Sequence, residues 1–181
     1  MGDAAVVENR HLVGQKTVMI RSCFMVLVLI FAFGVRAQSV EEGAAIMEPI
    51  TKLFTGMNLG DSAMVHAAFT ARPTMATVTK DKTGKPVLRT DDIQKFLKAV
   101  GTPHAESWSE PIWDVKIQVD GNLAQVWAKY AFYLGKKFSH CGVDAFQLFK
   151  GEDGKWRIFF LADTRQFEQC DIPNHIKESF K

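Results

Sequence analysis

The stretch that decides the fold runs from residue 112 to residue 164 and reads IWDVKIQVD (112–120), GNLAQVWAKYAFYL (121–134), GKKFSHCGVDAFQLFK (135–150) and GEDGKWRIFFLADT (151–164). Within each piece, apolar side chains tend to recur at every second position, which is the period of a β-strand. The pieces are separated by Asp120-Gly121, by Leu134 to Lys137 and by Gly151 to Gly154, which are typical of turns. The stretch therefore predicts four strands joined as an antiparallel meander: Ile112–Val119, Asn122–Tyr133, Phe138–Phe149 and Trp156–Thr164.

A helical pattern precedes the meander. From Val40 to Met57, apolar residues recur every three or four positions, which indicates an amphipathic helix. Pro49 interrupts this pattern. Either the helix begins near Glu48, with Pro49 in its first turn, or a longer helix bends at Pro49.

Two shorter helices and a hairpin separate the first helix from the meander. Asp61 occupies the N-cap position of the second helix, and Thr90 that of the third. Between them, Pro73 to Thr79 and Val87-Leu88 predict the two strands of a short hairpin. Helices that precede antiparallel strands, rather than alternating with them, predict an α+β fold.

The N-terminus carries the pattern of an export signal. Arg21 precedes an apolar run from Cys23 to Phe33, and Val35-Arg36-Ala37 resembles the site that signal peptidase cleaves. We therefore predict that residues 1–37 are an N-terminal extension and a cleavable signal peptide, and that residues 38–181 are a single periplasmic or secreted domain without a stable membrane anchor. An uncleaved anchor is the alternative, although the run is shorter than the ~20 residues of a spanning helix. Met1 and Met19 are both candidate start residues.

Charge and cysteine content bear on nucleic-acid binding, disulfide formation and metal binding. The net charge is +2 and the Lys/Arg residues form no run, so we predict no binding to nucleic acid. After cleavage Cys141 and Cys170 remain, and an even count in an oxidising compartment suggests one disulfide. Two separate buried thiols are the alternative. No His/Cys group has the spacing of a zinc site, so we predict no metal.

Turn geometry assigns strand residues to the two faces of the sheet. With a two-residue turn at Asp120-Gly121, Trp113 and Tyr130 share an apolar face and Trp127 lies on the opposite one. Counting through the next two turns brings four polar residues together on the Trp127 face: His140, Asp144, Asp163 and Arg165. One β-bulge would move every residue beyond it to the other face. Without a bulge, the polar groups of an apolar pocket are instead Tyr130, Ser139 and Thr164, with His66 or Arg72 from the helices.

The four clustered residues are candidates for general acid–base chemistry. We assign His140, Asp144 and Asp163 as catalytic, because an imidazole titrates near neutral pH and a carboxylate can hold one of its tautomers. We assign Arg165 to an anionic group or an enolate. The remaining candidates for ligand binding are Tyr130, Trp127, Trp113 and His66. The alternative is a structural ion-pair network at the end of the sheet or in a dimer interface.

Several segments resemble a known superfamily. Leu53-Phe54-x-Gly56-Met57-x-x-Gly60-Asp61, together with the order of elements, resembles the nuclear transport factor two-like superfamily. Trp113-Asp114-Val115, Phe138 to Phe146, and Leu161 to Arg165 are similar to its exported bacterial branch labelled "putative lumazine-binding", akin to the SnoaL-like proteins. The resemblance covers roughly Val40 to Cys170.

This resemblance implies a cone: a highly curved antiparallel sheet packed on three N-terminal helices, with homodimers formed through the outer face of the sheet. We expect a pocket for a small apolar or aromatic molecule and no cofactor. The superfamily contains enzymes and binding modules, so the fold leaves two functions open. One is cofactor-free proton transfer of the isomerase, dehydratase or cyclase type. The alternative is a non-catalytic dimeric ligand carrier or protein-interaction module.

Overall fold

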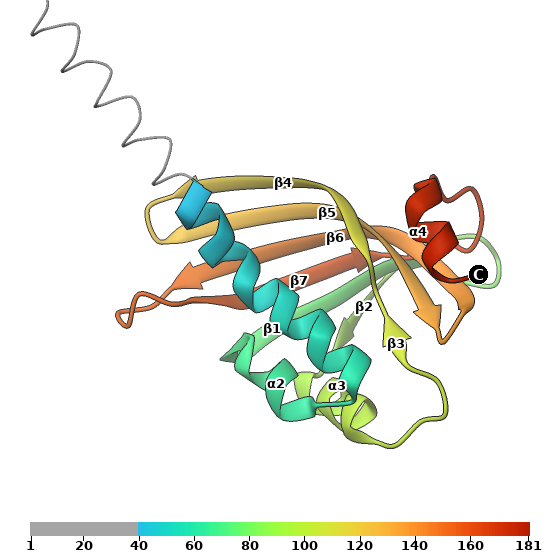
Figure 1. The fold of residues 1–181 in the computed structure, drawn as a ribbon, viewed down its shortest axis with the longest axis horizontal. Helices are drawn as coiled ribbons and strands as arrows, with labels where there is room; N and C mark the ends of the chain where they lie inside the picture. The colour runs from blue at the N-terminus through green and yellow to red at the C-terminus, as the bar shows by residue number, and fades with distance from the viewer. Residues whose placement is uncertain (1–39) are drawn as a thin grey trace, which may run out of the picture. The chain divides into compact units, whose positions relative to one another are not determined.

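One open, curved sheet organises the structure, a computed structural model that describes residues 40–181 (Figure 1). The predicted extension and signal peptide, residues 1–37, lie outside the described residues. The strands in chain order are β1 (Phe69–Lys80), β2 (Pro86–Asp91), β3 (Trp108–Ser109), β4 (Ile112–Asp120), β5 (Leu123–Leu134), β6 (Lys137–Lys150) and β7 (Trp156–Thr164).

The strands lie in the order β2-β1-β7-β6-β5-β3, and β4 also pairs with β5. The predicted meander from β4 to β7 is present, and the α+β class is confirmed. Strands β1 and β7 run parallel, whereas the other pairs are antiparallel. The prediction of a wholly antiparallel sheet is therefore corrected at that pair, because the N-terminal hairpin joins the β7 edge in the same direction as β7.

The helices before the meander follow the predicted order. The first is helical over residues 40–59 and continues through Pro49, so the alternative in which it begins near Glu48 is wrong. Helix α2 (Ser62–Ala67) is capped by Asp61, whose Oδ1 accepts a hydrogen bond from the Met64 amide at 2.9 Å. These helices and α3 lie on one side of the sheet (Figure 1).

Helix α3 (Ile93–Gly101) begins later than predicted. Its cap is Asp92, whose Oδ1 accepts from the Gln94 amide at 2.7 Å, while Thr90 lies within β2 and pairs with Ala76. Strand pairing thus extends into the segment predicted as the start of the helix. The structure also contains a C-terminal helix that the sequence did not indicate, α4 (Asn174–Ser179).

Two apolar clusters cover opposite faces of the sheet. On the inner face, which we define as the face toward the first helix and α3, Ile50 and Leu53 pack against Val126, Phe146 and other strand residues. On the outer face, the C-terminal segment packs against the end of the sheet through a second cluster that includes Tyr133, Ile172 and Ile176. The rings of Tyr133 and Phe180 stack at 3.9 Å between centroids.

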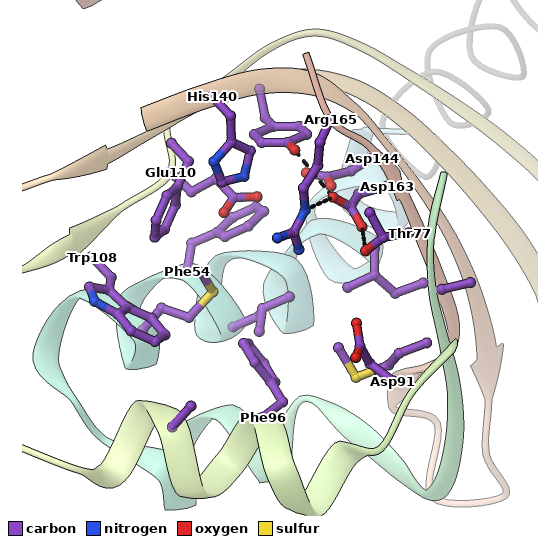
Figure 2. Close-up of a pocket in the computed structure, with 18 of the residues that line it drawn as sticks. Phe54, Thr77, Asp91, Phe96, Trp108, Glu110, His140, Asp144, Asp163 and Arg165 are labelled. Atoms are coloured by element: carbon purple, nitrogen blue, oxygen red, sulfur yellow. Dashed lines mark hydrogen bonds and ion pairs between the residues drawn. The ribbon is translucent and has the colours of Figure 1, made fainter. Parts of the chain in front are cut away.

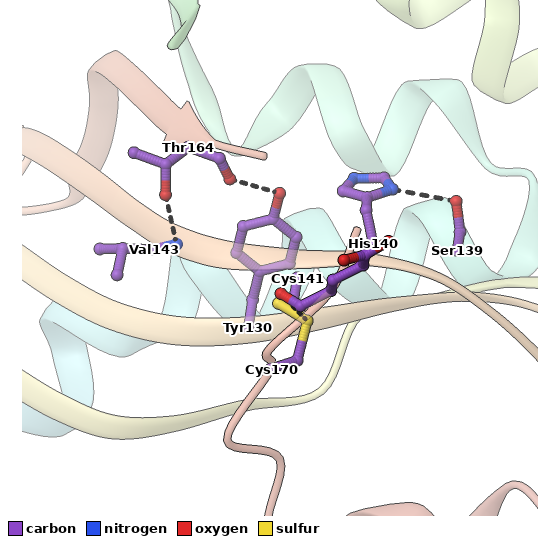
Figure 3. The surroundings of a disulfide bond; sticks show 8 residues. Tyr130, Ser139, His140, Cys141, Val143, Thr164 and Cys170 are labelled. Carbon is purple, nitrogen blue, oxygen red and sulfur yellow. Dashed lines mark hydrogen bonds between the residues drawn. A yellow bond between two sulfur atoms is a disulfide. The ribbon is translucent and has the colours of Figure 1, made fainter. Parts of the chain in front are cut away.

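A disulfide ties this C-terminal segment to the sheet. Cys141 on β6 is bonded to Cys170, at a sequence separation of 29 residues (Figure 3). The Cys141 and Gln166 backbones also exchange two hydrogen bonds, of 2.9 and 2.8 Å. The tail after β7 is therefore held beside residue 140, which lines the cavity described below.

A β-bulge in β6 decides which side chains face inward. Phe132 pairs with His140 and Tyr133 with Phe138, so Ser139 is an extra residue with no partner on β5. Beyond Ser139, the side chains of β6 change faces relative to a regular hairpin. The prediction that His140 and its neighbours share the face of Trp127 is therefore wrong, because these residues lie on the inner face with Tyr130.

A second bulge, at Phe159 in β7, shifts the pairing of β7 with β6 by one residue. Gln147 pairs with Phe160 and Leu148 with Ile158, so Phe159 of β7 has no partner on β6. Asp144 then pairs directly with Asp163, so both carboxyl groups project from the same face of the sheet. The two bulges together bring the polar side chains of β6 and β7 to the inner face.

A third bulge lies in β4 and moves Trp113 outward. Trp113 pairs with Lys129 and Lys116 with Trp127, so β4 carries one residue more than β5 between these pairs. Asp114 adopts a left-handed backbone conformation there, with φ of 52°. Trp113 consequently packs in the outer cluster and does not share the face of Tyr130 as predicted.

Candidate functional site

A cavity of about 370 Å³ lies between the helices and the inner face of the sheet (Figure 2). This volume falls in the range of small-molecule sites. Its apolar walls come from both layers: Phe54, Met57, Phe96, Trp108, Phe132 and Leu161. Polar side chains gather at the sheet end of the cavity: Glu110, Tyr130, His140, Asp144, Asp163 and Arg165.

Asp163 is the fixed point of this polar end. Its Oδ1 accepts a short hydrogen bond of 2.5 Å from the Thr77 hydroxyl. Its Oδ2 accepts from Arg165 Nε at 2.7 Å and from the Tyr130 hydroxyl at 3.2 Å. Because three donors occupy this carboxylate, Asp163 serves to position Arg165 and Tyr130. Its predicted catalytic role becomes a positioning role in our interpretation.

Tyr130 is held from the sheet side. Its hydroxyl also donates to the Thr164 carbonyl oxygen at 2.9 Å, and its side chain is almost fully buried (Figure 3). Burial, followed by the negative charge of Asp163, raises the pKa of Tyr130 well above its usual range. Tyr130 therefore stays a neutral hydrogen-bond donor whose partners are protein oxygens.

Asp144 is the residue with unused hydrogen-bonding capacity. It lies 2% exposed in the cavity wall, and its Oδ2 has no hydrogen-bond partner among residues 40–181. Burial raises the pKa of Asp144 far above its ordinary value, and the neighbouring Glu110 and Asp163 raise it further. At neutral pH Asp144 therefore carries a proton, which makes it a potential donor to a bound molecule.

Glu110 forms a pair with Asp144. It lies in the short link between β3 and β4, and a side-chain hydrogen bond with Asp144 couples the two carboxyl groups. Burial is the main cause that raises the pKa of Glu110, and the charge of Asp163 adds to it. The buried Asp144 and the partly buried Glu110 therefore retain protons near neutral pH, and their titrations belong to the pair.

His140 is the basic group of the cavity. Burial, and then the nearby positive charge of Arg165, lowers the pKa of His140 to about 4. Its Nδ1 lies 3.0 Å from Ser139 Oγ, the bulge residue, and its ring packs against Phe132 at 5.1 Å between centroids. His140 is therefore a neutral imidazole at pH 7, and Ser139 occupies one of its two nitrogens.

The structure brings together five of the predicted site residues around one cavity: His140, Asp144, Asp163, Arg165 and Tyr130. The other three lie elsewhere. Trp127 is on the outer face with 45% of its surface exposed, and Trp113 packs in the outer cluster. His66 is exposed on α2, beside a separate shallow groove toward α3. Their positions give no support to a ligand-binding role in this cavity.

Glu110 is the site residue that sequence reasoning missed. It precedes Pro111 in a segment that looks like a connecting loop, and β3 is only two residues long. One signal was available: Trp108, Glu110 and Ile112 are spaced by two, and both flanking residues pack against the inner core. A carboxyl group between inward-facing residues of an extended segment points inward as well.

Two negative findings concern the described residues. In residues 40–181 no three His, Cys, Asp or Glu side chains are arranged as a metal-ion site. Within the same residues, none of the helices has both the length and the apolar character to cross a bilayer.

Comparisons with known proteins relate this chain to one family. A sequence model of the family described as "Putative lumazine-binding" matches residues 41–160. No curated protein matches the chain. The matched range contains most of the cavity lining but ends before Leu161, Asp163 and Arg165.

Solved structures share the fold. An NTF2-like protein of unknown function from Shewanella baltica OS155 is 24% identical, with a TM-score of 0.53 over 70% of this chain and 95% of that chain. An NTF2-like protein with a cystatin-like fold from Novosphingobium aromaticivorans is 11% identical, with a TM-score of 0.57 over 82% and 94%. The beta subunit of a "putative aromatic-ring-hydroxylating dioxygenase" from Novosphingobium aromaticivorans DSM 12444 is 13% identical, with a TM-score of 0.58 over 74% and 93%.

At these identities the structural likenesses establish the fold and not an activity. The family model, in contrast, spans more than half of the sequence. The fold is that of the NTF2-like proteins, and the chain belongs to the family described as "Putative lumazine-binding".

Proposed function

We propose that this protein binds a small, mainly apolar molecule in the cavity and moves a proton on it without a cofactor. One observation carries the proposal. Asp144 Oδ2 is buried, lacks a partner among residues 40–181, and belongs to a side chain that lines the cavity. A buried polar atom without a partner costs about 1–3 kcal/mol, so a bound molecule that supplies the missing partner is stabilised by the same order.

The neighbouring groups have the protonation states that proton transfer needs. The protonated Asp144–Glu110 pair can donate to a carbonyl oxygen, and neutral His140 can accept a proton from the adjacent carbon through Nε2. The proton removed from carbon resides on His140 and then returns to another carbon of the same molecule. Atoms and charge balance over the cycle, which is an isomerisation. If the enol instead expels a neighbouring hydroxyl group, the proton on His140 leaves with it as water and the enol proton returns to the Asp144–Glu110 pair, which gives a dehydration.

The test uses hydrogen exchange, because it needs no knowledge of the product. Full-length protein is incubated with a metabolite extract in D2O, and the retained molecule is identified by native mass spectrometry. We expect deuterium to enter carbon positions of the retained molecule, and Asp144→Asn and His140→Gln to slow this exchange at least tenfold. Asp153→Asn, in the exposed β6–β7 turn, is the matched control and should exchange like the wild type.

The second candidate function is a carrier without turnover. It is favoured by the Asp163–Arg165 ion pair, which fixes part of the polar end in place. Retention of a molecule without any carbon deuteration would support the carrier. Absence of any retained molecule, with no shift of melting temperature across the extract, would contradict both functions.

We also propose that two copies associate through the outer face of the sheet. That face exposes large apolar side chains, among them Leu123 at 51%, Trp127 at 45% and Phe149 at 49%. Adjacent exposed apolar residues of this size are typical of interaction surfaces. Light scattering after gel filtration should give a dimer for the wild type and a monomer for Trp127→Glu. A monomeric wild type would contradict the proposal.

Export is the third part of the proposal. The Cys141–Cys170 disulfide supports it, because such bonds persist in oxidising compartments. Sequencing the N-terminus of protein recovered from the periplasm or medium of a bacterial host should give Gln38 as the first residue. Recovery of uncleaved chain from the cytoplasm alone would count against the export signal.

A further inference from the structure

The guanidinium group of Arg165 has unused donors that face the cavity. Its Nε donates to Asp163 Oδ2, whereas Nη1 and Nη2 donate to no residue in the described range. In Figure 2 the group extends from the sheet toward the helix side of the cavity. An arginine held by one edge presents the other two nitrogens as a planar fork, which matches the two oxygens of a carboxylate.

This fork is fixed before any ligand arrives. Asp163, which holds Arg165, is itself held by the Thr77 and Tyr130 hydroxyls, so the guanidinium has a rigid support. The side chain of Arg165 is 44% exposed, which leaves a path for a ligand from solvent. A preorganised side chain loses less conformational freedom on binding than a mobile one, which favours affinity.

Arg165 is the cationic group at the polar end of the cavity, whereas Asp91, Asp92 and Lys95 line the helix side. Asp163 is occupied by its three donors, and the partly buried Glu110 and the buried Asp144 retain their protons near neutral pH. The polar end therefore presents mainly hydrogen-bond donors. The aromatic side chains of Phe54, Phe96 and Trp108 form apolar walls of the same cavity.

We propose that the bound molecule is an aromatic or alicyclic carboxylic acid, whose carboxylate pairs with Nη1 and Nη2 of Arg165 and whose ring packs against Phe54, Phe96 and Trp108. This inference rests on the proposed function, because it specifies the ligand class of the same cavity. It also separates two tasks at the polar end: Arg165 holds the anion and Asp144 contacts the reacting group.

The test compares three probes that share one ring system and differ in charge: 2-naphthoate, 2-naphthamide and 2-naphthylmethylamine. Calorimetric titration of the full-length protein at pH 7 should show 2-naphthoate binding roughly ten- to a hundredfold more tightly than the amide, the range expected for a charge-assisted bidentate pair. The amine should bind most weakly.

Two arginine variants locate the effect. Arg165→Met should remove the preference for naphthoate over the amide, and Arg165→Lys should retain part of this preference because Lys keeps the charge. Arg157→Met is the matched control, since Arg157 pairs with Asp153 in the exposed β6–β7 turn. It should bind all three probes like the wild type.

The outcomes separate the two proposals. Equal affinity for acid and amide, tighter binding of the amine, or a naphthoate preference that survives in Arg165→Met would overturn the carboxylate inference and leave the ligand pocket standing. Failure of the wild type to bind any of the three probes would count against the pocket itself. Melting temperatures of both Arg165 variants show whether a loss of binding reflects unfolding.

Discussion

Replacing His140 with glutamine tests the electrostatics of the cavity through stability, without requiring a ligand. The pKa of His140 is lowered from an ordinary 6.5 to about 4, first by burial and then by Arg165. The unfolded chain therefore takes up a proton near pH 6.5, whereas the folded chain does so only near pH 4. Between these values the unfolded state binds more protons, so folding stability falls as the pH is lowered.

The size of the effect follows from the two pKa values. At pH 5, the difference in proton binding corresponds to about 2 kcal/mol of lost stability relative to pH 7. His140 is partly accessible to solvent, which screens the interaction, so we expect ~1–2 kcal/mol. Glutamine does not titrate, so this portion of the pH dependence disappears in His140→Gln.

The assay is urea unfolding of the wild type and His140→Gln at pH 7 and pH 5. The stability of the wild type relative to the variant should fall by the stated amount between the two pH values. The other groups that face His140 are present in both proteins, so most of their contribution to the pH dependence cancels in the comparison. These groups are Glu110, Asp144, Asp163, Arg165 and Tyr130. His66→Gln, an exposed position on α2, should show no comparable change.

Two results would refute this reasoning. The first is a stability difference between wild type and His140→Gln that stays the same at pH 7 and pH 5. The second is an imidazole proton resonance of His140 that titrates near pH 6.5 in the folded protein. Either result would mean that the ring is solvated and not buried against Phe132 and Arg165.

Three further predictions concern the carboxyl pair, a close backbone contact and the disulfide. The pKa values of Asp144 and Glu110 are raised in the folded protein, so their protonated forms stabilise the fold at low pH and this contribution is lost as the pH rises. In urea unfolding, the wild type should therefore lose at least about 1 kcal/mol relative to Asp144→Asn between pH 6 and pH 9. A difference that does not depend on pH would contradict the pairing. A Cβ at Gly142 would overlap the Thr164 carbonyl oxygen, so Gly142→Ala should lower stability by about 3 kcal/mol in thermal unfolding, whereas Gly43→Ala, which meets open space, should not destabilise; equal melting temperatures would refute the contact. Reduction of the Cys141–Cys170 bond, which closes a 29-residue separation, should cost roughly 3–4 kcal/mol in guanidinium unfolding with and without reductant, and an unchanged midpoint would show that the bond does not constrain the unfolded chain.

The elements of this fold were largely predictable because each has a local cause. Alternating side chains and turn residues place β4 to β7 within one or two residues of their observed bounds. The cap of α2 follows from Asp61 alone. Thr90 was wrongly predicted as the cap of α3. Its capping chemistry is local, whereas β2 continues through Asp91 because it pairs with β1.

The cavity was less predictable because it depends on counts of residues between paired strands. The cluster of His140, Asp144, Asp163 and Arg165 follows from strand pairing, but its face depends on Ser139 and Phe159, which leave no distinctive sequence signal. An extra residue in a strand looks the same in a sequence as a regular one. The position of Glu110 was obscured for another reason, since β3 pairs with β5 over only two residues.

The bulge at Ser139 sets which side chains of β6 face the cavity. If Ser139 paired regularly with Phe132 and did not bulge, every later residue of β6 would change faces: Asp144 would turn toward the outer surface, and its apolar neighbours Val143 and Ala145 would turn into the cavity. No side chain in the cavity would have been substituted, yet His140 and Asp144 would leave its polar end. Removal of Ser139, in contrast, would leave His140 paired with Phe132 and Asp144 with Ala128, so the chemistry of the cavity depends on the pairing register of β6 as well as on which residues the strand contains.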